Sequence, residues 1–366
     1  MPTTPSALPK LDRDSLLSRT FTALKWILAL MVVTSHFVKY WFMPDAIEKA
    51  APWSGRISNL VYAFITNCEV PLFFIMSGFF FCTTAGYVAG EHSRKIKQRL
   101  FSLGVPYVTF IIYGLAVTWI FCWATGDFSV WNDYSTIDKL TGYRNIFPVN
   151  TPLWYMRDLM LLCLLAPVFA WLINITRGWI IALLTVLFIA CFQPYTIAHY
   201  LMGLLFFPAG YMIRLRGADL LRLSRQTLPY LLPAYIAIGL LIACNYVDSH
   251  FWLKNIEICL SVPVIFAVVS YLVEWGRVKP GEYLGSVTFF IFLTHHPLRQ
   301  VAVYIYARFW PTMGDGGYLL ALGLTILSVV VGLGGIFCIL DRFCPRVAAF
   351  ITGRRTVAPQ THRKAE

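Results

Sequence analysis

The sequence is poor in charged residues. Asp, Glu, Lys and Arg make up 13% of the 366 residues, whereas 58% are hydrophobic and the mean hydropathy is +0.65. A soluble domain carries about twice that charged fraction, so an ordinary soluble protein is excluded. The composition instead predicts an all-α, polytopic membrane bundle.

Other absences argue against further classes of protein and site. The nine cysteines are scattered, mostly in apolar runs, with no CxxC motif and no Cys/His spacing typical of a metal site. We expect these cysteines to act as small hydrophobic residues, and we predict neither disulfides nor a metal. We expect no internal repeat, cleavable signal or appended soluble domain. Basic cytoplasmic loops explain the net charge of +12, so no nucleic-acid partner is expected.

Hydropathy predicts about ten transmembrane helices. They lie near residues 21–42, 57–83, 100–124, 152–175, 178–193, 197–213, 228–247, 255–274, 285–306 and 318–341. With the N-terminus inside, the inner segments hold most of the 30 Lys and Arg residues, which fits the positive-inside rule with both termini cytoplasmic. We therefore expect a multi-pass protein of the cytoplasmic (inner) membrane.

This topology divides the chain into three parts. Residues 1–20 form a cytoplasmic N-terminal segment, residues 21–341 the transmembrane domain, and residues 342–366 a basic cytoplasmic tail. The longest outer loop, residues 125–151, is either a lid over an outer cavity or an ordinary connector.

Two ionisable residues lie in the first span, with ten residues between them. Eleven helical steps return within about 20° of the start, so Lys25 and His36 share one face, about 16 Å apart along the axis. Ionisable groups at membrane depth are costly and mark candidate functional sites. Lys25 is either a snorkelling anchor near the inner interface or a functional group. His36, toward the outer half, is the candidate general base, because burial favours its neutral form.

The second span combines a carboxylate with two helix-perturbing residues. Pro71 breaks the hydrogen-bond ladder and Gly78 permits close backbone approach, so we expect one helix kinked against a neighbour. Glu69 is predicted to be a buried carboxylate near mid-span that needs a partner. Ser77 is either a nucleophile or a packing residue beside Gly78.

Four cations follow this span. Arg94 and Lys97 share one helical face, and Lys95 and Arg99 share another. They match a polyphosphate ligand or anionic lipid head groups, and topology alone also explains them.

The fourth and ninth spans bring further polar residues to the outer half. Trp154 opens the fourth span near Arg157 and Asp158, which are expected to pair with other helices because adjacent helical residues do not face each other. In the ninth span one of His295 and His296 is expected to face the interior and the other the interface. Inner cations thus suit a phosphate-bearing donor, and outer polar groups suit acid–base work on an acceptor reached from outside.

Taken together, these motifs resemble the acyltransferase-3 family of membrane O-acyltransferases. The resemblance rests on the Lys25/His36 pair, on the basic loop leading to Pro106 and Tyr107, and on four further segments, and it covers residues 20–341. The four segments are Val70-Pro-Leu-Phe-Phe-Ile-Met-Ser-Gly-Phe79, Leu153-Trp-Tyr-Met-Arg-Asp-Leu159, Phe206-Phe-Pro-Ala-Gly-Tyr211 and Phe292-Leu-Thr-His-His-Pro-Leu298. The resemblance implies ten helices, a cytoplasmic acyl-CoA donor and transfer to a carbohydrate hydroxyl. Lys25 and His36 fall on the family's Arg/Lys-ten-His pair, and residues 94–99 on its Arg-x-x-Arg loop.

Two departures qualify the resemblance. The basic loop reads Arg94-x-x-Lys97 instead of two arginines, which leaves open which cations meet the donor. The Trp154 motif lacks the Ser-Leu-x-x-Glu continuation of members that carry an extracytoplasmic esterase-like domain, so a stand-alone enzyme is expected.

The resulting hypothesis is an O-acetyltransferase with His36 as general base. Asp158 or Glu69 orients the imidazole. Acyl-CoA binds at four cations, and acceptor or oxyanion support comes from residues of three spans. The four cations are Lys25, Arg94, Lys97 and Arg99. The supporting residues are Ser77, Trp154, Arg157, His295 and His296.

The substrates follow from the same hypothesis. Acetyl-CoA is the donor, succinyl-CoA is the alternative, and no cofactor is bound permanently. The acceptor is a cell-surface glycan or its lipid-linked precursor, of the exopolysaccharide or O-antigen type. Two rival functions remain open: a glycan or lipid exporter that uses buried His and Glu as a proton relay, and a non-catalytic partner of polysaccharide-assembly proteins.

Overall fold

The predicted all-α architecture is confirmed. The computed structural model describes residues 12–40, 52–65, 67–82, 89–132, 135–143, 147–191, 196–244, 251–309 and 314–353. Within these ranges every regular element is a helix and no strand occurs.

The helices follow the predicted apolar runs. In chain order they are α1 (Arg13–Tyr40), α3 (Pro52–Ile65), α4 (Glu69–Phe81), α5 (Ala89–Thr125), α6 (Ser129–Asn132), α7 (Thr136–Thr141), the 3₁₀ helix η1 (Thr151–Leu153), α8 (Trp154–Ile175), α9 (Trp179–Ile189), α10 (Thr196–Leu215), α11 (Leu220–Ala243), α12 (Phe251–Glu274), α13 (Glu282–Phe309), α14 (Asp315–Phe343) and α15 (Pro345–Ile351). Except for 57–83, each predicted span coincides with one of these helices. Six of those described are long and apolar enough to cross a membrane, and α4 and α9 are shorter apolar helices. The chain is a multi-pass membrane protein.

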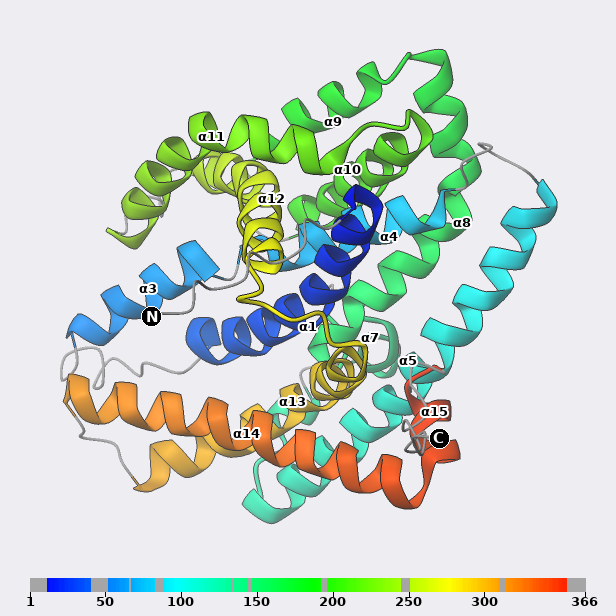
Figure 1. Cartoon of the computed structure of the whole chain (residues 1–366). Helices are drawn as coiled ribbons and strands as arrows, with labels where there is room; N and C mark the ends of the chain where they lie inside the picture. Colours follow the sequence, from blue (N-terminus) through cyan, green and yellow to red (C-terminus); the bar gives the residue numbers. More distant parts are fainter. Residues whose placement is uncertain are drawn as a thin grey trace, which may run out of the picture.

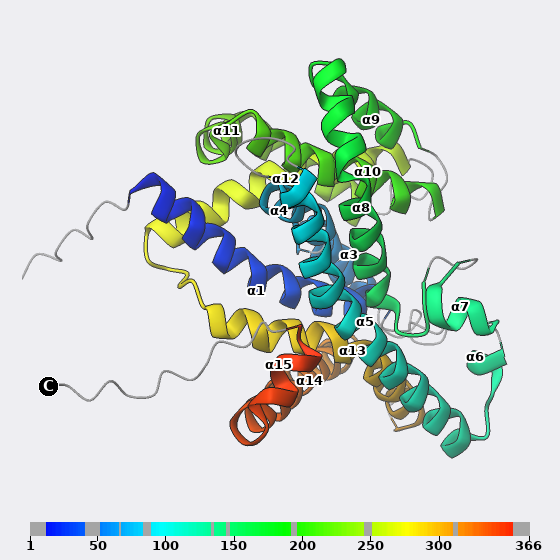
Figure 2. The ribbon, with the colours of Figure 1, turned by 90° about the vertical axis from the view of Figure 1, so that its right-hand side faces the viewer.

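Helix α1 lies at the centre of the bundle (Figures 1 and 2). It packs against α3, α4, α12, α13 and α14. Leu24, Leu28 and Phe37 are completely buried along it, as expected for a helix that is apolar on most of its circumference. The helix that carries Lys25 and His36 is therefore surrounded by protein.

The expectation of one kinked helix over 57–83 is wrong. The segment forms two helices, α3 and α4, and Glu69 is the first residue of α4 instead of lying at mid-span. Pro71 lies in the first turn of α4, where its missing N–H leaves no helical hydrogen bond unmade. Asn67 and Glu69 at the break are buried, and Asn67 donates to Glu257 of α12. Irregular backbone within a membrane protein is tolerated where protein covers it.

Helical structure extends past both predicted ends of the transmembrane domain, whose bounds stay a prediction. Helix α1 begins at Arg13, inside the segment expected to precede it, and the Arg13 guanidinium lies 3.1 Å from the Asp219 carboxylate before α11. At the other end α15 packs on α5, so ordered structure continues past residue 341. Residues 354–366 of the expected tail lie outside the described residues.

Contacts between distant segments bring the predicted inner ends together. Arg13 meets Asp219, the Arg225 side chain meets Glu274 at 2.8 Å, and Lys95 Nζ donates to the Phe81 carbonyl at 2.7 Å. These three contacts join the ends that the alternating topology assigns to the same side.

Candidate active site

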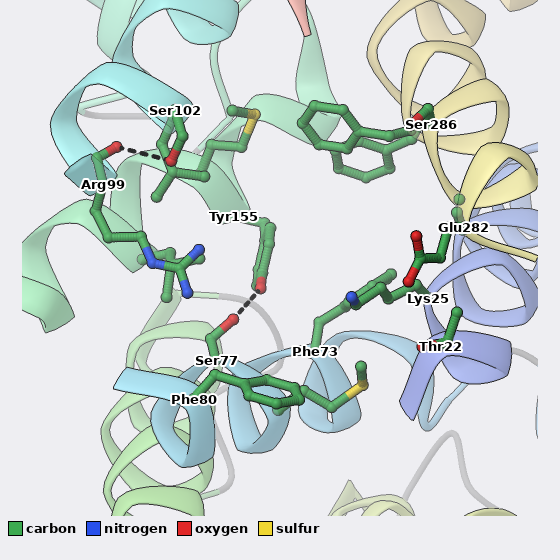
Figure 3. Close-up of a pocket in the computed structure, with 18 of the residues that line it drawn as sticks. Thr22, Lys25, Phe73, Ser77, Phe80, Arg99, Ser102, Tyr155, Glu282 and Ser286 are labelled. Carbon is green, nitrogen blue, oxygen red and sulfur yellow. Dashed lines mark hydrogen bonds between the residues drawn. The ribbon is translucent and has the colours of Figure 1, made fainter. Parts of the chain in front are cut away.

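A cavity of about 600 Å³ opens between α1, α4, α5, α8 and α13. Three of the residues selected from the sequence, Lys25, Ser77 and Arg99, line it together. Figure 3 shows Arg99 and Lys25 pointing into the cavity from opposite walls, with Ser77 and Tyr155 between them. A volume in this range suits a small-molecule substrate.

The polar groups of the cavity are arranged in two sets. Ser77 Oγ and Tyr155 Oη lie 3.0 Å apart in a hydrogen bond, between the two cations. Glu282 lies beside Lys25 on the α13 wall (Figure 3). The cavity lining thus holds two positive groups, one carboxylate and several hydroxyls, including those of Ser77 and Tyr155.

The cations at the start of α5 have separate roles. Arg99 lines the cavity, whereas Arg94 and Lys97 are exposed and Arg94 lies 3.9 Å from Glu91. Lys95 donates to the carbonyls of Phe80 and Phe81 at the end of α4, where a cation stabilises the negative end of the helix. Of the four predicted donor-binding residues, the cavity therefore unites Lys25 and Arg99 and leaves out Arg94 and Lys97.

His36 belongs to a second group, made of three histidines. Its ring centroid lies 5.1 Å from that of His295 and 5.6 Å from that of His296. His295 is 0% exposed and His296 is 5% exposed, so the expectation that one of them is interfacial is wrong. Within the described residues no group of three His, Cys, Asp or Glu side chains is arranged to hold a metal ion.

Hydrogen bonds to backbone carbonyls define the tautomers of two of these rings. His36 Nδ1 lies 2.7 Å from the Val32 carbonyl oxygen, and His295 Nδ1 lies 3.0 Å from that of Ile291. A carbonyl oxygen only accepts, so in each ring Nδ1 carries the hydrogen and Nε2 keeps its lone pair when the ring is neutral. Nε2 of His36 is thus the basic atom.

The histidine group lies beyond one end of the cavity. Thr22, Lys25 and Ala29 line the cavity at helical spacing along α1, and His36 follows Ala29 by about two turns. On α13 the lining ends at Phe292, whose ring centroid lies 6.3 Å from that of His295. Phe292 thus lies both in the cavity wall and beside the histidine group.

Arg157 and Asp158 pair with each other, contrary to the expectation from their adjacency. Arg157 Nε donates to Asp158 Oδ1 at 2.7 Å, and its Nη1 donates to the Thr141 carbonyl. The long Arg157 side chain folds back on its neighbour near the start of α8. Arg157 and Asp158 thereby hold the segment that contains α6 and α7, which projects from the bundle in Figure 2.

The two predicted orienting carboxylates lie elsewhere. Asp158 accepts from Arg157, and Glu69 lies at the α3–α4 break, close enough to Glu257 for their charges to interact. His36 Nδ1, the atom that such a carboxylate would bind, already donates to Val32. Trp154 is buried against His199, with ring centroids 5.0 Å apart, and does not line the cavity.

Sequence reasoning missed Tyr155 and Glu282. Tyr155 follows the selected Trp154 by one residue, and a helical wheel of α8 would have placed it on a different face. Glu282 had a weaker signal, because it precedes the predicted span 285–306.

The comparisons with known proteins agree with the resemblance drawn from the motifs. Residues 19–340 match the acyltransferase domain Acyl_transf_3. The chain belongs to the acyltransferase-3 family. It is also 30% identical over 222 residues to the succinoglycan biosynthesis protein ExoH of Rhizobium meliloti (strain 1021), a match that covers 58% of this chain and 57% of that relative. No solved structure matches the chain.

Proposed function

We propose that the protein is a membrane O-acyltransferase that moves an acyl group from acyl-CoA to a hydroxyl of a surface polysaccharide or its lipid-linked precursor. Acetyl-CoA is the proposed donor and succinyl-CoA the alternative. The observation that carries this proposal is the course of α1, which has Lys25 in the cavity wall and His36 beyond the end of the cavity. The name of the relative ExoH, a succinoglycan biosynthesis protein, supports a polysaccharide acceptor.

In the proposed complex the donor occupies the cavity. Arg99 and Lys25 bind its phosphates by charge-assisted hydrogen bonds, and the Ser77–Tyr155 pair binds the polar pantetheine arm. The acyl end points along α1 toward His36. Phe292, which lies in the cavity wall and beside His295, lines the path by which the thioester reaches His36.

The chemistry uses His36 Nε2 as general base. It removes the proton of the acceptor hydroxyl while the hydroxyl oxygen attacks the thioester carbonyl carbon. The carbon–sulfur bond then breaks, and the imidazolium returns the proton to the leaving thiolate. The products are the acylated glycan and CoA, and Val32 holds the ring through Nδ1 throughout.

The reaction is tested with purified protein, labelled acetyl-CoA or succinyl-CoA, and candidate glycans. We expect release of CoA that depends on the acceptor, together with label in the glycan. Absence of acceptor-dependent release with either donor contradicts the proposal.

Replacing Arg99 with Gln is expected to weaken acyl-CoA binding by about tenfold or more, because one charge-assisted hydrogen bond contributes about 1.5–3 kcal/mol. Equilibrium binding of acyl-CoA to the purified variants measures this effect. Arg346→Gln, at an exposed arginine of α15, is the matched control and should bind like the wild type. Arg94→Gln and Lys97→Gln should change the affinity less than Arg99→Gln. An unchanged affinity of the Arg99 variant would remove this residue from the donor site.

Proton-coupled export of a glycan or lipid is a second candidate function. Glu257 on α12 is fully buried at the α3–α4 break, where Asn67 Nδ2 donates to it at 2.7 Å. Discontinuous helices and buried ionisable groups are typical of secondary transporters. Glycan transport in proteoliposomes that survives His36→Gln but not Glu257→Gln would favour export over acyl transfer.

A further inference from the structure

A proline interrupts the backbone hydrogen bonds of α13 beside the histidines. Pro297 has no N–H, so the Leu293 carbonyl, four residues earlier, lacks its helical donor. Leu293 and Pro297 are both buried, and a buried carbonyl without a donor is costly. Since His295 and His296 lie between these positions, the group that binds this carbonyl also holds the turn that carries them.

Asn150 supplies the missing donor from the segment before η1. It is completely buried, and its Nδ2 donates to the Leu293 carbonyl at 2.9 Å and to the Phe110 carbonyl of α5 at 3.1 Å. Both hydrogens of the amide are thereby used. One side chain thus joins the interrupted turn of α13 to α5.

Two neighbours on α5 complete this arrangement. Gly114 leaves the space for Asn150, because a Cβ at position 114 would lie 2.9 Å from the Asn150 Cβ. Tyr113 Oη donates to the Thr294 carbonyl at 3.1 Å. Two consecutive carbonyls of α13 therefore accept hydrogen bonds from outside their own helix.

We propose that Asn150 is a positioning residue for acyl transfer, which holds the 293–297 turn so that the rings of His295 and His296 stay against His36. The inference rests on the proposed function. Within the described residues neither His295 Nε2 nor His296 Nδ1 has a hydrogen-bond partner. His295 Nδ1 donates to the Ile291 carbonyl of the same helix, so the position of its ring relative to His36 follows the α13 backbone that Asn150 holds.

The test combines Asn150→Ala with Pro297→Ala. Asn150→Ala is expected to lower kcat about tenfold or more, since small misplacements of catalytic groups are costly, with an unchanged KM for acyl-CoA and a lower Tm. Pro297→Ala gives the Leu293 carbonyl a helical N–H. In the double variant the Leu293 carbonyl has this helical donor, so much of the lost Tm should return. The kcat should stay low, because the 293–297 turn is then regular helix and no longer has the interrupted geometry that positions the histidines.

A matched control is Asn255→Ala. Asn255 is another buried asparagine whose Nδ2 donates to two carbonyls, those of Phe188 and Cys191, away from the histidines. It should lower Tm and leave the kcat of the folded protein unchanged. Tyr113→Phe, which removes only a hydroxyl, should lower kcat by a smaller factor and serves if Asn150→Ala does not fold.

Two results overturn the inference: a wild-type kcat in folded Asn150→Ala, or no recovery of Tm in the double variant. The Tm measurements need no substrate. If the wild type itself transfers no acyl group, the proposed function fails. The Tm values of the wild type, the two single variants and the double variant still decide whether Asn150 holds the Pro297 turn.

Discussion

Replacing His36 with Gln is expected to lower kcat for acyl transfer by about 10²–10⁴-fold, the usual contribution of a general base. Glutamine keeps an N–H that can donate to the Val32 carbonyl, so the local hydrogen bond in α1 can persist. It has no basic nitrogen to replace Nε2. The affinity for acyl-CoA should not change, because His36 lies beyond the cavity that Lys25 and Arg99 line.

Single-turnover rates and equilibrium binding of acyl-CoA separate these two effects. Ser35→Ala is the matched control, since Ser35 Oγ donates to the same Val32 carbonyl at 2.8 Å. This control removes a hydrogen bond at the same place and leaves the imidazole intact, so it should retain activity. Retained acyl transfer in folded His36→Gln would show that His36 is not the general base and that another group removes the proton.

The histidine group shows what one sequence can predict about a site. The spacing of Lys25 and His36 follows from helix geometry alone, and the structure places them on α1 as expected. The approach of His295 and His296 to His36 depends on how α13 packs against α1. Residues 259 positions apart along the chain carry no periodic signal of such a contact, so the sequence left open which histidine faces inward.

For the carboxylates Asp158 and Glu69, sequence reasoning predicted the wrong surroundings. Adjacency on a helix argued against an Arg157–Asp158 pair, but the long Arg side chain folds back on its neighbour near the start of α8. Glu69 was placed at mid-span because hydropathy reads 57–83 as continuous. A break of the helix preserves the apolar average while it moves a residue to a helix start, so hydropathy could not detect it.

Replacing Gly78 or Gly210 with Ala is expected to destabilise the fold strongly. The two glycines let α4 and α10 cross with their backbones in contact: a methyl group at Gly78 would overlap the Phe207 carbonyl, and one at Gly210 would overlap that of Ile75. Backbone atoms cannot rotate away as a flexible side chain can, so the helices must separate. Overpacking of this kind costs on the order of 3 kcal/mol. Thermal unfolding in detergent and the yield of monodisperse protein measure the loss.

The control and the double variant make this prediction specific. Gly332→Ala in α14 meets nothing within 4 Å, so it should be neutral or stabilising by up to about 1 kcal/mol, because Ala favours helix over Gly. If Gly78→Ala is also neutral or stabilising, the backbones of α4 and α10 do not approach each other as closely as the structure shows. The double variant should lose less than the sum of the single losses, since one separation of the helices accommodates both methyl groups. Ser77 and Phe80 line the cavity on either side of Gly78, so the same separation should weaken acyl-CoA binding in whatever fraction still folds.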